Sequence, residues 1–160
     1  MDRNRLISFT TIGILVLIWG VAGNAMGMPI WISFITWATF FAMGASPRDI
    51  IRLAPSLAAG IVLGILSGQL IGVLAPALGS ITGPLISAIT AFLIMIISLI
   101  PTFSFAAGMF VGWSVFIGSG NDLAATLICV LAGLALSYLS VTVPGLLSGK
   151  KVRQSTESTT

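Results

Sequence analysis

Six apolar runs, separated by short polar gaps, occupy almost the whole of this sequence. They cover residues 6–21, 29–43, 53–78, 84–100, 103–117 and 123–143. The chain of 160 residues is 57% hydrophobic and 7% charged, and its mean hydropathy is +1.13. A domain of this size has too little interior to cover so much apolar surface, so lipid must be the solvent for most of it. Backbone polar groups in lipid must be paired within the segment, which predicts an all-α membrane protein.

The basic residues predict how the chain crosses the membrane. They lie at three places between or outside the apolar runs: Arg3, Arg5, Arg48, Arg52, Lys150, Lys151 and Arg153. A span needs about 20 residues, so runs 29–43 and 103–117 are short and are either full spans or re-entrant pieces. Six crossings with the N-terminus inside place every basic residue on the cytoplasmic side, whereas five crossings place the last cluster outside. The positive-inside rule therefore favours six transmembrane helices with both termini cytoplasmic.

The two ends of the chain carry their own signals. Gly23-Asn24-Ala25 follows the first run and offers a small-x-small cleavage pattern, but the run is longer than a typical signal-peptide core. An uncleaved first helix fits the rest of the sequence equally well. At the other end, residues 148–160 are rich in Ser and Thr and lack apolar periodicity, which predicts a disordered cytoplasmic tail. Residues 1–147 then form a single integral membrane domain.

The chain resembles itself when it is shifted by 73 positions. Four stretches of the first half then match the second half, the upstream one after insertion of two residues in the second copy: Ser46 on Ser119, Asp49 on Asp122, Ala59-Gly60 on Ala132-Gly133, and Ile32-Ser33-Phe34 on Phe103-Ser104-Phe105. Residues 6–78 and 84–147 therefore look like two repeats of three runs each. Chance similarity between Gly/Ala/Leu-rich helices is the alternative. Units with an odd number of spans insert upside down relative to each other, and such inverted repeats are a common plan of transporters and channels.

Glycines recur at helical spacing in three of the runs. They are Gly60, Gly64, Gly68 and Gly72 in the third run, Gly108 and Gly112 in the fifth, and Gly133 in the sixth. Four-residue spacing places glycines on one face of a helix, and close backbone approach through such faces drives helix association in lipid. We expect these glycines to pack helices, within one subunit or between subunits. Lining of a pore is the alternative.

Few polar groups lie inside the runs, and some of them are candidates for lining a pathway. Gln69 carries a primary amide that needs a partner, so it should face the protein interior. The segment from Pro101 to Asp122 combines small residues, phenylalanines and hydroxyls, as a wet lining would. The predicted lining residues are Trp37, Gln69, Phe103, Ser104, Trp113 and Ser114. The alternative is structural: hydroxyls often bond to their own helix, and tryptophans fill cores.

Several classes of chemistry are excluded by what the sequence lacks. It contains no His and one Cys, Cys129 within an apolar run, so we expect no catalytic triad, no metal site and no disulfide. No carboxylate lies in mid-span, which argues against an ion-driven pump and an intramembrane hydrolase. Asp49 and Asp122 lie at membrane edges, where helix capping is the expected role. We expect a protein that is not an enzyme, with no cofactor and no nucleic-acid partner.

The last two runs resemble a known family. Their motifs are Phe110-Val111-Gly112 and Phe116-Ile117-Gly118-Ser119-Gly120-Asn121-Asp122, followed by Gly133, Ser137 and Tyr138, with Trp19-Gly20 in the first run. The chain is similar along nearly its whole length to the YcdZ-like small bacterial inner-membrane proteins, the domain-of-unknown-function family ten-ninety-seven. The resemblance implies an integral protein of the bacterial inner (plasma) membrane without assigned activity, and it supplies no catalytic residues. The Pro-Thr-Phe segment at Pro101 also looks like segments of urea-type channels, an analogy only.

The sequence thus predicts a six-helix membrane bundle built from two inverted halves. Such a small bundle barely encloses a path, so we expect a homo-oligomer joined along its glycine stripes. The leading functional hypothesis is passive passage, or binding, of a small neutral or weakly polar solute. The alternative is a non-transporting assembly or accessory protein whose glycines face a partner.

Overall fold

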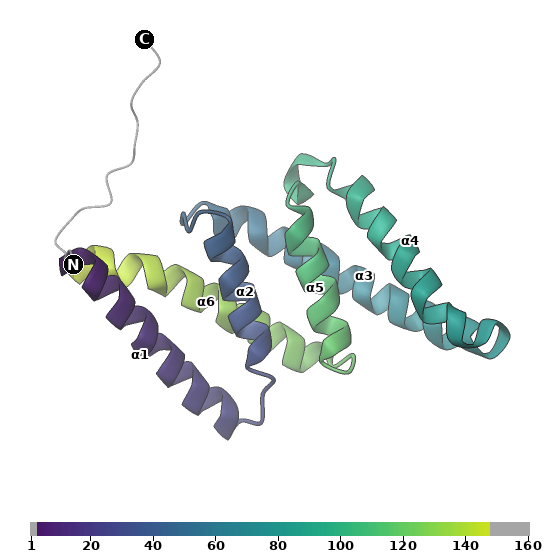
Figure 1. Cartoon of the computed structure of the whole chain (residues 1–160), viewed down its shortest axis with the longest axis horizontal. Coiled ribbons are helices and arrows are strands. Elements are labelled where there is room, and N and C mark those ends of the chain that lie inside the picture. The colour runs from purple at the N-terminus through teal and green to yellow at the C-terminus, as the bar shows by residue number, and fades with distance from the viewer. Residues whose placement is uncertain (1–2, 148–160) are drawn as a thin grey trace, which may run out of the picture.

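The computed structural model describes residues 3–147, and most of this part of the chain is helical (Figure 1). It contains six α-helices: α1 (Arg3–Ala25), α2 (Trp31–Ala42), α3 (Asp49–Leu78), α4 (Thr82–Ile97), α5 (Ala106–Gly118) and α6 (Leu123–Leu147). Two 3₁₀ turns, Gly79–Ile81 and Pro101–Phe103, connect α3 to α4 and lead toward α5. No strand occurs between residues 3 and 147, so the predicted all-α class is confirmed. The predicted cytoplasmic tail lies outside the described residues.

The helices are long and apolar enough for a membrane protein. Within residues 3–147, three helical stretches reach the length and hydropathy of a membrane span: Arg3–Ala25, Asp49–Ile97 and Leu123–Leu147. The second of these is the hairpin of α3 and α4. The apolar helices α2 and α5 have 12 and 13 residues, which at 1.5 Å per residue corresponds to about 18–20 Å, less than the roughly 30 Å of a hydrocarbon core. The number of crossings therefore stays a prediction.

The ends of two runs can be compared with the helices. The third run and α3 both end at Leu78, and Gly79 follows with a φ of 62° that only glycine adopts without strain. The fifth run does not begin its helix at Phe103. Pro101 opens a 3₁₀ turn instead, and α5 starts at Ala106.

This second boundary also removes one of the proposed repeat matches. Ile32-Ser33-Phe34 lie within α2, whereas Phe103-Ser104-Phe105 precede α5 and belong to its approach. The two triplets therefore occupy different kinds of structure, and their likeness in sequence does not reflect equivalent positions.

Each short helix packs across one of the long central helices. The main contacts join α5 to α3 and α2 to α6, while α4 packs beside α3 and α1 beside α6. Figure 1 shows the result as an elongated bundle with α1 at one end and α4 at the other. In Figure 1 the start of α1 overlaps the end of α6, and the two helices are in contact.

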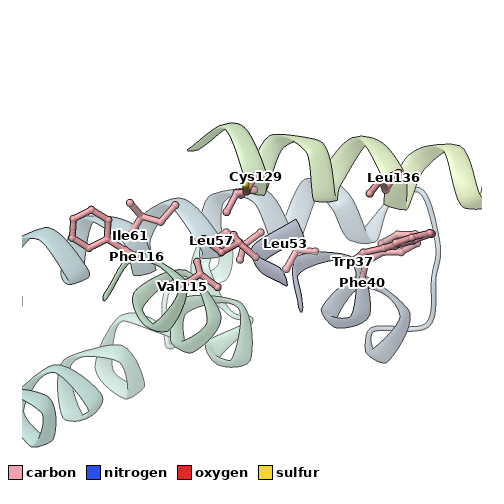
Figure 2. Packing of buried hydrophobic residues seen from close by; sticks show 11 residues of the cluster. Trp37, Phe40, Leu53, Leu57, Ile61, Val115, Phe116, Cys129 and Leu136 are labelled. Carbon is pink, nitrogen blue, oxygen red and sulfur yellow. The ribbon is translucent and has the colours of Figure 1, made fainter. Parts of the chain in front are cut away.

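The core forms where the four inner helices meet. Figure 2 shows Trp37 and Phe40 of α2 beneath Leu136 of α6, and Phe116 of α5 beside Ile61 of α3; all belong to one buried cluster. A second, smaller cluster joins α3, α4 and α5 through Leu63, Ile94 and Met109. The long outer helices leave many large apolar side chains exposed on their outward faces, as a lipid-facing surface requires.

Both turns that follow the short helices contain an aspartate whose carboxylate accepts a backbone N–H. The Oδ2 atom of Asp49 accepts a hydrogen bond from the backbone N–H of Ser46 at 2.9 Å, and Oδ1 of Asp122 accepts one from the N–H of Ala125 at 3.0 Å. The Asp122 contact pairs a donor in the first turn of α6 that a helix start leaves free, so the expected capping role of Asp122 is confirmed. Asp49 lies in the first turn of α3, and its hydrogen bond is to Ser46, which precedes the helix.

The Asp122 cap leads to a first prediction. Asp122→Ala is expected to lower the free energy of unfolding by about 1 kcal/mol, because the N–H of Ala125 loses its acceptor. Thermal unfolding of the purified protein in detergent measures the change. Asp122→Asn keeps an acceptor oxygen and serves as the control, with a loss of only a few tenths of a kcal/mol. An equal loss in both variants would show that the negative charge, and not capping, is what matters.

Candidate functional site

The six predicted lining residues do not converge on one cavity. Trp37 is buried in the interface between α2 and α6, and Trp113 reaches from α5 to α3. Gln69 and Ser114 are exposed on α3 and α5, so the expectation that Gln69 faces the protein interior was wrong. Phe103 and Ser104 lie in the turn before α5, near the start of α3. The structure thus places three of these side chains, Gln69, Trp113 and Ser114, on the α3–α5 pair and separates Trp37 from them.

Two indole–hydroxyl hydrogen bonds join the short helices to the long ones. Trp113 of α5 donates through Nε1 to Oγ of Ser67 on α3 at 3.0 Å. Trp37 of α2 donates through Nε1 to Oγ of Ser140 on α6 at 3.2 Å. Ser67 and Ser140 are 140 − 67 = 73 positions apart, which is the shift that aligns the chain with itself. The short helix of each half therefore makes the same type of contact with the long helix of the other half.

Sequence reasoning missed Ser67 and Ser140. The signal was present, because the 73-residue shift superposes one serine on the other. Both hydroxyls also donate to backbone carbonyls near their own position, Ser67 to Leu63 and Ser140 to Ser137. Each hydroxyl is thus held in place on its helix and is free to accept the indole N–H.

The glycines mark where helix backbones touch. A Cβ at Gly60 would lie 2.8 Å from the carbonyl carbon of Met109 and from the backbone nitrogen of Trp113, and a Cβ at Gly112 would overlap the Leu57 carbonyl. On the other side of the bundle, a Cβ at Gly133 would lie 2.7 Å from the Ser33 carbonyl oxygen. Only glycine permits these approaches.

The other predicted packing glycines differ in their surroundings. A Cβ at Gly64 would meet the Phe116 ring at 2.8 Å, and one at Gly108 would meet the Phe105 ring at 2.8 Å. A Cβ at Gly68 would lie 3.5 Å from the Asn121 amide oxygen, while Gly72 has nothing within 4 Å among the described residues. The stripe on α3 therefore packs against α5 in its first half and becomes open toward its end.

A small hollow at the C-terminal end of α5 gathers neutral polar groups. It has a volume of about 270 Å³ and is lined by Ile65, Gly68, Gln69, Phe116 and Asn121. Asn121 is held by the turn after α5 with a φ of 66°, a conformation that asparagine tolerates better than most residues. Two primary amides offer both donors and acceptors without charge. This arrangement fits a small neutral, hydrogen-bonding molecule.

A larger and more apolar hollow adjoins it between α3 and α4. Its volume is about 380 Å³, and its polar lining residues are Ser67, Gln69 and Thr90. Gln69 lines both hollows, and Ser67 is the acceptor of the Trp113 indole. No group of three or more His, Cys, Asp or Glu residues that could hold a metal ion occurs between residues 3 and 147. The hydroxyl and amide groups of this region can form hydrogen bonds within an otherwise apolar wall.

The opposite end of α5 has a different electrostatic character. The guanidinium Nη2 of Arg52, in the first turn of α3, donates to Oγ of Ser104 at 3.2 Å. Ser104 is a neutral hydroxyl, so this contact does not cancel the charge of Arg52. The α3–α5 pair is therefore bounded by neutral amides at one end and by a cation at the other.

Comparison with known proteins gives a family and no activity. No curated protein and no solved structure matches the chain. A family model described as a protein of unknown function, DUF1097, matches residues 10–144, which extend from within α1 almost to the end of α6. The match covers far more than half of the sequence and includes α2 to α5 completely and most of α1 and α6. The chain therefore belongs to the DUF1097 family of proteins of unknown function.

Proposed function

We propose that this membrane protein is a six-span bundle of two inverted three-helix repeats that provides passive passage for a small neutral or weakly polar solute. The observation that carries the proposal is the pair of equivalent indole–hydroxyl bonds, Trp37 to Ser140 and Trp113 to Ser67. In each case the short helix of one half packs on the long helix of the other half, α2 on α6 and α5 on α3. The peripheral contacts follow the same rule, α1 on α6 and α4 on α3.

This exchange of partners is what an inverted repeat predicts. In such proteins the short segments of the two halves meet near the midplane, and the solute site forms beside them. The helices α2 and α5 are the short segments here, and they also contact each other. The proposed topology places both termini in the cytoplasm of a bacterial cell, in agreement with the contact between α1 and α6 and with the overlap of the start of α1 and the end of α6 in Figure 1.

The proposed solute class follows from the lining groups. Gln69 and Asn121 supply neutral donors and acceptors to the 270 Å³ hollow, and the hydroxyls of Ser67 and Thr90 lie in the next one. Uncharged groups in an apolar wall favour neutral solutes, because an ion would lose its hydration without receiving a countercharge. Passive passage of such a solute requires no catalytic group.

A homo-oligomer remains part of the proposal. The end of the α3 stripe at Gly72, and both Gly13 and Gly20 of α1, have nothing within 4 Å in the described chain. Small residues on outward faces permit close approach of a second copy in lipid. The same open glycines favour the alternative role, an accessory subunit whose partner covers them.

Solute flux in sealed proteoliposomes tests the proposed function. Light scattering after osmotic steps of urea, formamide, glycerol or water is expected to report faster flux than in empty vesicles for at least one neutral solute. Gln69→Leu and Ser114→Leu are expected to reduce that flux severalfold, because each removes a polar group from the α3–α5 pair. Thr10→Leu, an equally exposed polar position on the peripheral helix α1, is the matched control.

Absence of solute flux would contradict the proposal. Folded, inserted protein that gives no flux above empty vesicles for any solute of the panel excludes passive passage of this class. The accessory role then becomes the leading one, and substitution of Gly72 by leucine is expected to abolish co-purification of a partner.

A further inference from the structure

The seam between α3 and α4 contains two hollows in line with each other. The inner one has a volume of about 560 Å³. It is lined by Ile97 at the end of α4, by Ile100 and Phe103 of the connection to α5, and by five residues of α3: Pro55, Ala58, Ala59, Val62 and Leu63. The outer one, of about 380 Å³, is lined by residues 63–73 of α3 and by residues 86–93 of α4. Leu63 lines both, and it lies midway along α3.

The length of the inner hollow along α3 is close to the hydrocarbon thickness of one leaflet. The inner hollow follows eight residue steps of α3, from Pro55 to Leu63, which at 1.5 Å per residue is about 12 Å. Half of a hydrocarbon core is roughly 15 Å. All residues that line the inner hollow are apolar, so it has the depth and the surface of a groove for the acyl chain of one leaflet.

The inner hollow differs from the outer one in having a cation at its mouth. Arg52 lies one helical turn before Pro55, and its guanidinium donates to Ser104, the residue next to the lining residue Phe103. The carboxylate of Asp49, the nearest acidic residue along α3, accepts the backbone N–H of Ser46. A guanidinium at the membrane edge above an apolar groove between two helices is the arrangement that binds the phosphate of an anionic lipid.

We propose that the inner α3–α4 hollow is a binding site for an anionic phospholipid, whose acyl chain lies along the seam up to Leu63 and whose phosphate pairs with Arg52. The proposed topology, with both termini in the cytoplasm, places this site in the cytoplasmic leaflet. That placement therefore rests on the proposed function. The binding site itself rests on the hollow and the guanidinium, so it stands or falls independently of solute passage.

Native mass spectrometry of the full-length protein tests this site. The protein is extracted in detergent, mixed with phosphatidylglycerol or with phosphatidylcholine of the same acyl chains, and analysed for retained lipid. Wild type is expected to retain one phosphatidylglycerol about fivefold better than phosphatidylcholine. Arg52→Gln is expected to remove this preference, and Arg52→Lys to keep most of it.

Two further variants distinguish a specific site from general attraction to the surface. Arg48→Gln removes an exposed cation one turn away from Arg52 and is expected to keep the preference. Ala59→Leu fills the inner hollow and is expected to lower retention of both lipids. Equal retention of the two lipids by wild type, or equal effects of Arg48→Gln and Arg52→Gln, overturns the proposal. None of these readouts depends on solute flux, so a protein inactive in proteoliposomes can still show the lipid site.

Discussion

Gly112→Ala is expected to destabilise the protein strongly, although it adds a single methyl group. The Cβ of the new alanine would overlap the carbonyl group of Leu57, with the Leu57 carbonyl carbon at 2.9 Å and its Cα at 3.0 Å. These are backbone atoms in the middle of α3, so no side-chain rotation relieves the contact. Overpacking of a tight core typically costs about 1–3 kcal/mol, and sometimes more. We expect Gly112→Ala to lie at the upper end of this range.

The neighbouring glycine makes the interface doubly sensitive. Gly60 of α3 faces Met109 and Trp113 of α5, and its own Cβ would lie 2.8 Å from backbone atoms of both. Separation of the helices to accommodate a methyl at Gly112 would therefore also remove the contact at Gly60 and weaken the bond from Trp113 to Ser67. The loss of packing contacts therefore affects the whole interface between α3 and α5.

Gly72→Ala is the matched control for this experiment. It lies in the same stripe on the same helix, but a Cβ there has nothing within 4 Å. Because alanine is a better helix residue than glycine by roughly 0.5–1 kcal/mol, the control should be neutral or slightly stabilising. Thermal unfolding in detergent, followed by size-exclusion chromatography, compares the two. Equal midpoints for Gly112→Ala and Gly72→Ala would contradict the proposed contact between α3 and α5.

Much of the fold could be predicted because few backbone structures are stable in lipid. Apolar runs separated by short polar gaps predicted all six helices, since a segment in hydrocarbon must pair its own backbone. The glycine stripe predicted close packing, and the residues Gly60 and Gly64 lie against α5. The pattern did not predict where that packing ends. Gly72 has the same spacing as Gly60, but α5 is too short to reach it.

The partner of each polar side chain was harder to foresee. Trp37 and Trp113 are 113 − 37 = 76 positions apart, whereas Ser140 and Ser67 differ by 73. The turn between α5 and α6 covers residues 119–122 and is shorter than the one at residues 43–48, so no single shift aligns both helices of a pair. The match of Ile32-Ser33-Phe34 with Phe103-Ser104-Phe105 rested on local similarity alone and ignored this change of register. Partner choice depended on helix crossings, which sequence spacing alone does not contain.

Ser140→Ala is expected to destabilise the protein more than Ser67→Ala, although both remove the acceptor of an indole N–H. Trp37 and Ser140 are each only 4% exposed. Without the hydroxyl, the Nε1–H of Trp37 is left buried and unpaired, at a cost of about 1–3 kcal/mol. Trp113 is less deeply buried and borders the hollow between α3 and α4 through Ser67. Its N–H can turn to another acceptor there, so Ser67→Ala should cost less.

A double-mutant cycle separates the hydrogen bond from packing. Trp37→Phe combined with Ser140→Ala removes donor and acceptor together, so the double variant is expected to lose less than the sum of the single losses. Unfolding free energies of the four proteins measure this coupling, and the cycle of Trp113→Phe with Ser67→Ala provides the comparison from the other half. Additive losses in both cycles would mean that the two bonds contribute no net stability.

The contrast between the two cycles bears on the proposed pathway. A bond that only holds helices together should affect stability and flux in proportion, as expected for Trp37 and Ser140. A bond that borders a solute path should alter flux even where stability is nearly unchanged, as expected for Trp113 and Ser67. Ser67→Ala with near wild-type stability and altered flux would place the path beside α3 and α5. Unaltered flux in a protein that transports would place it elsewhere, because Ser67 and Gln69 together supply much of the polar lining on this side.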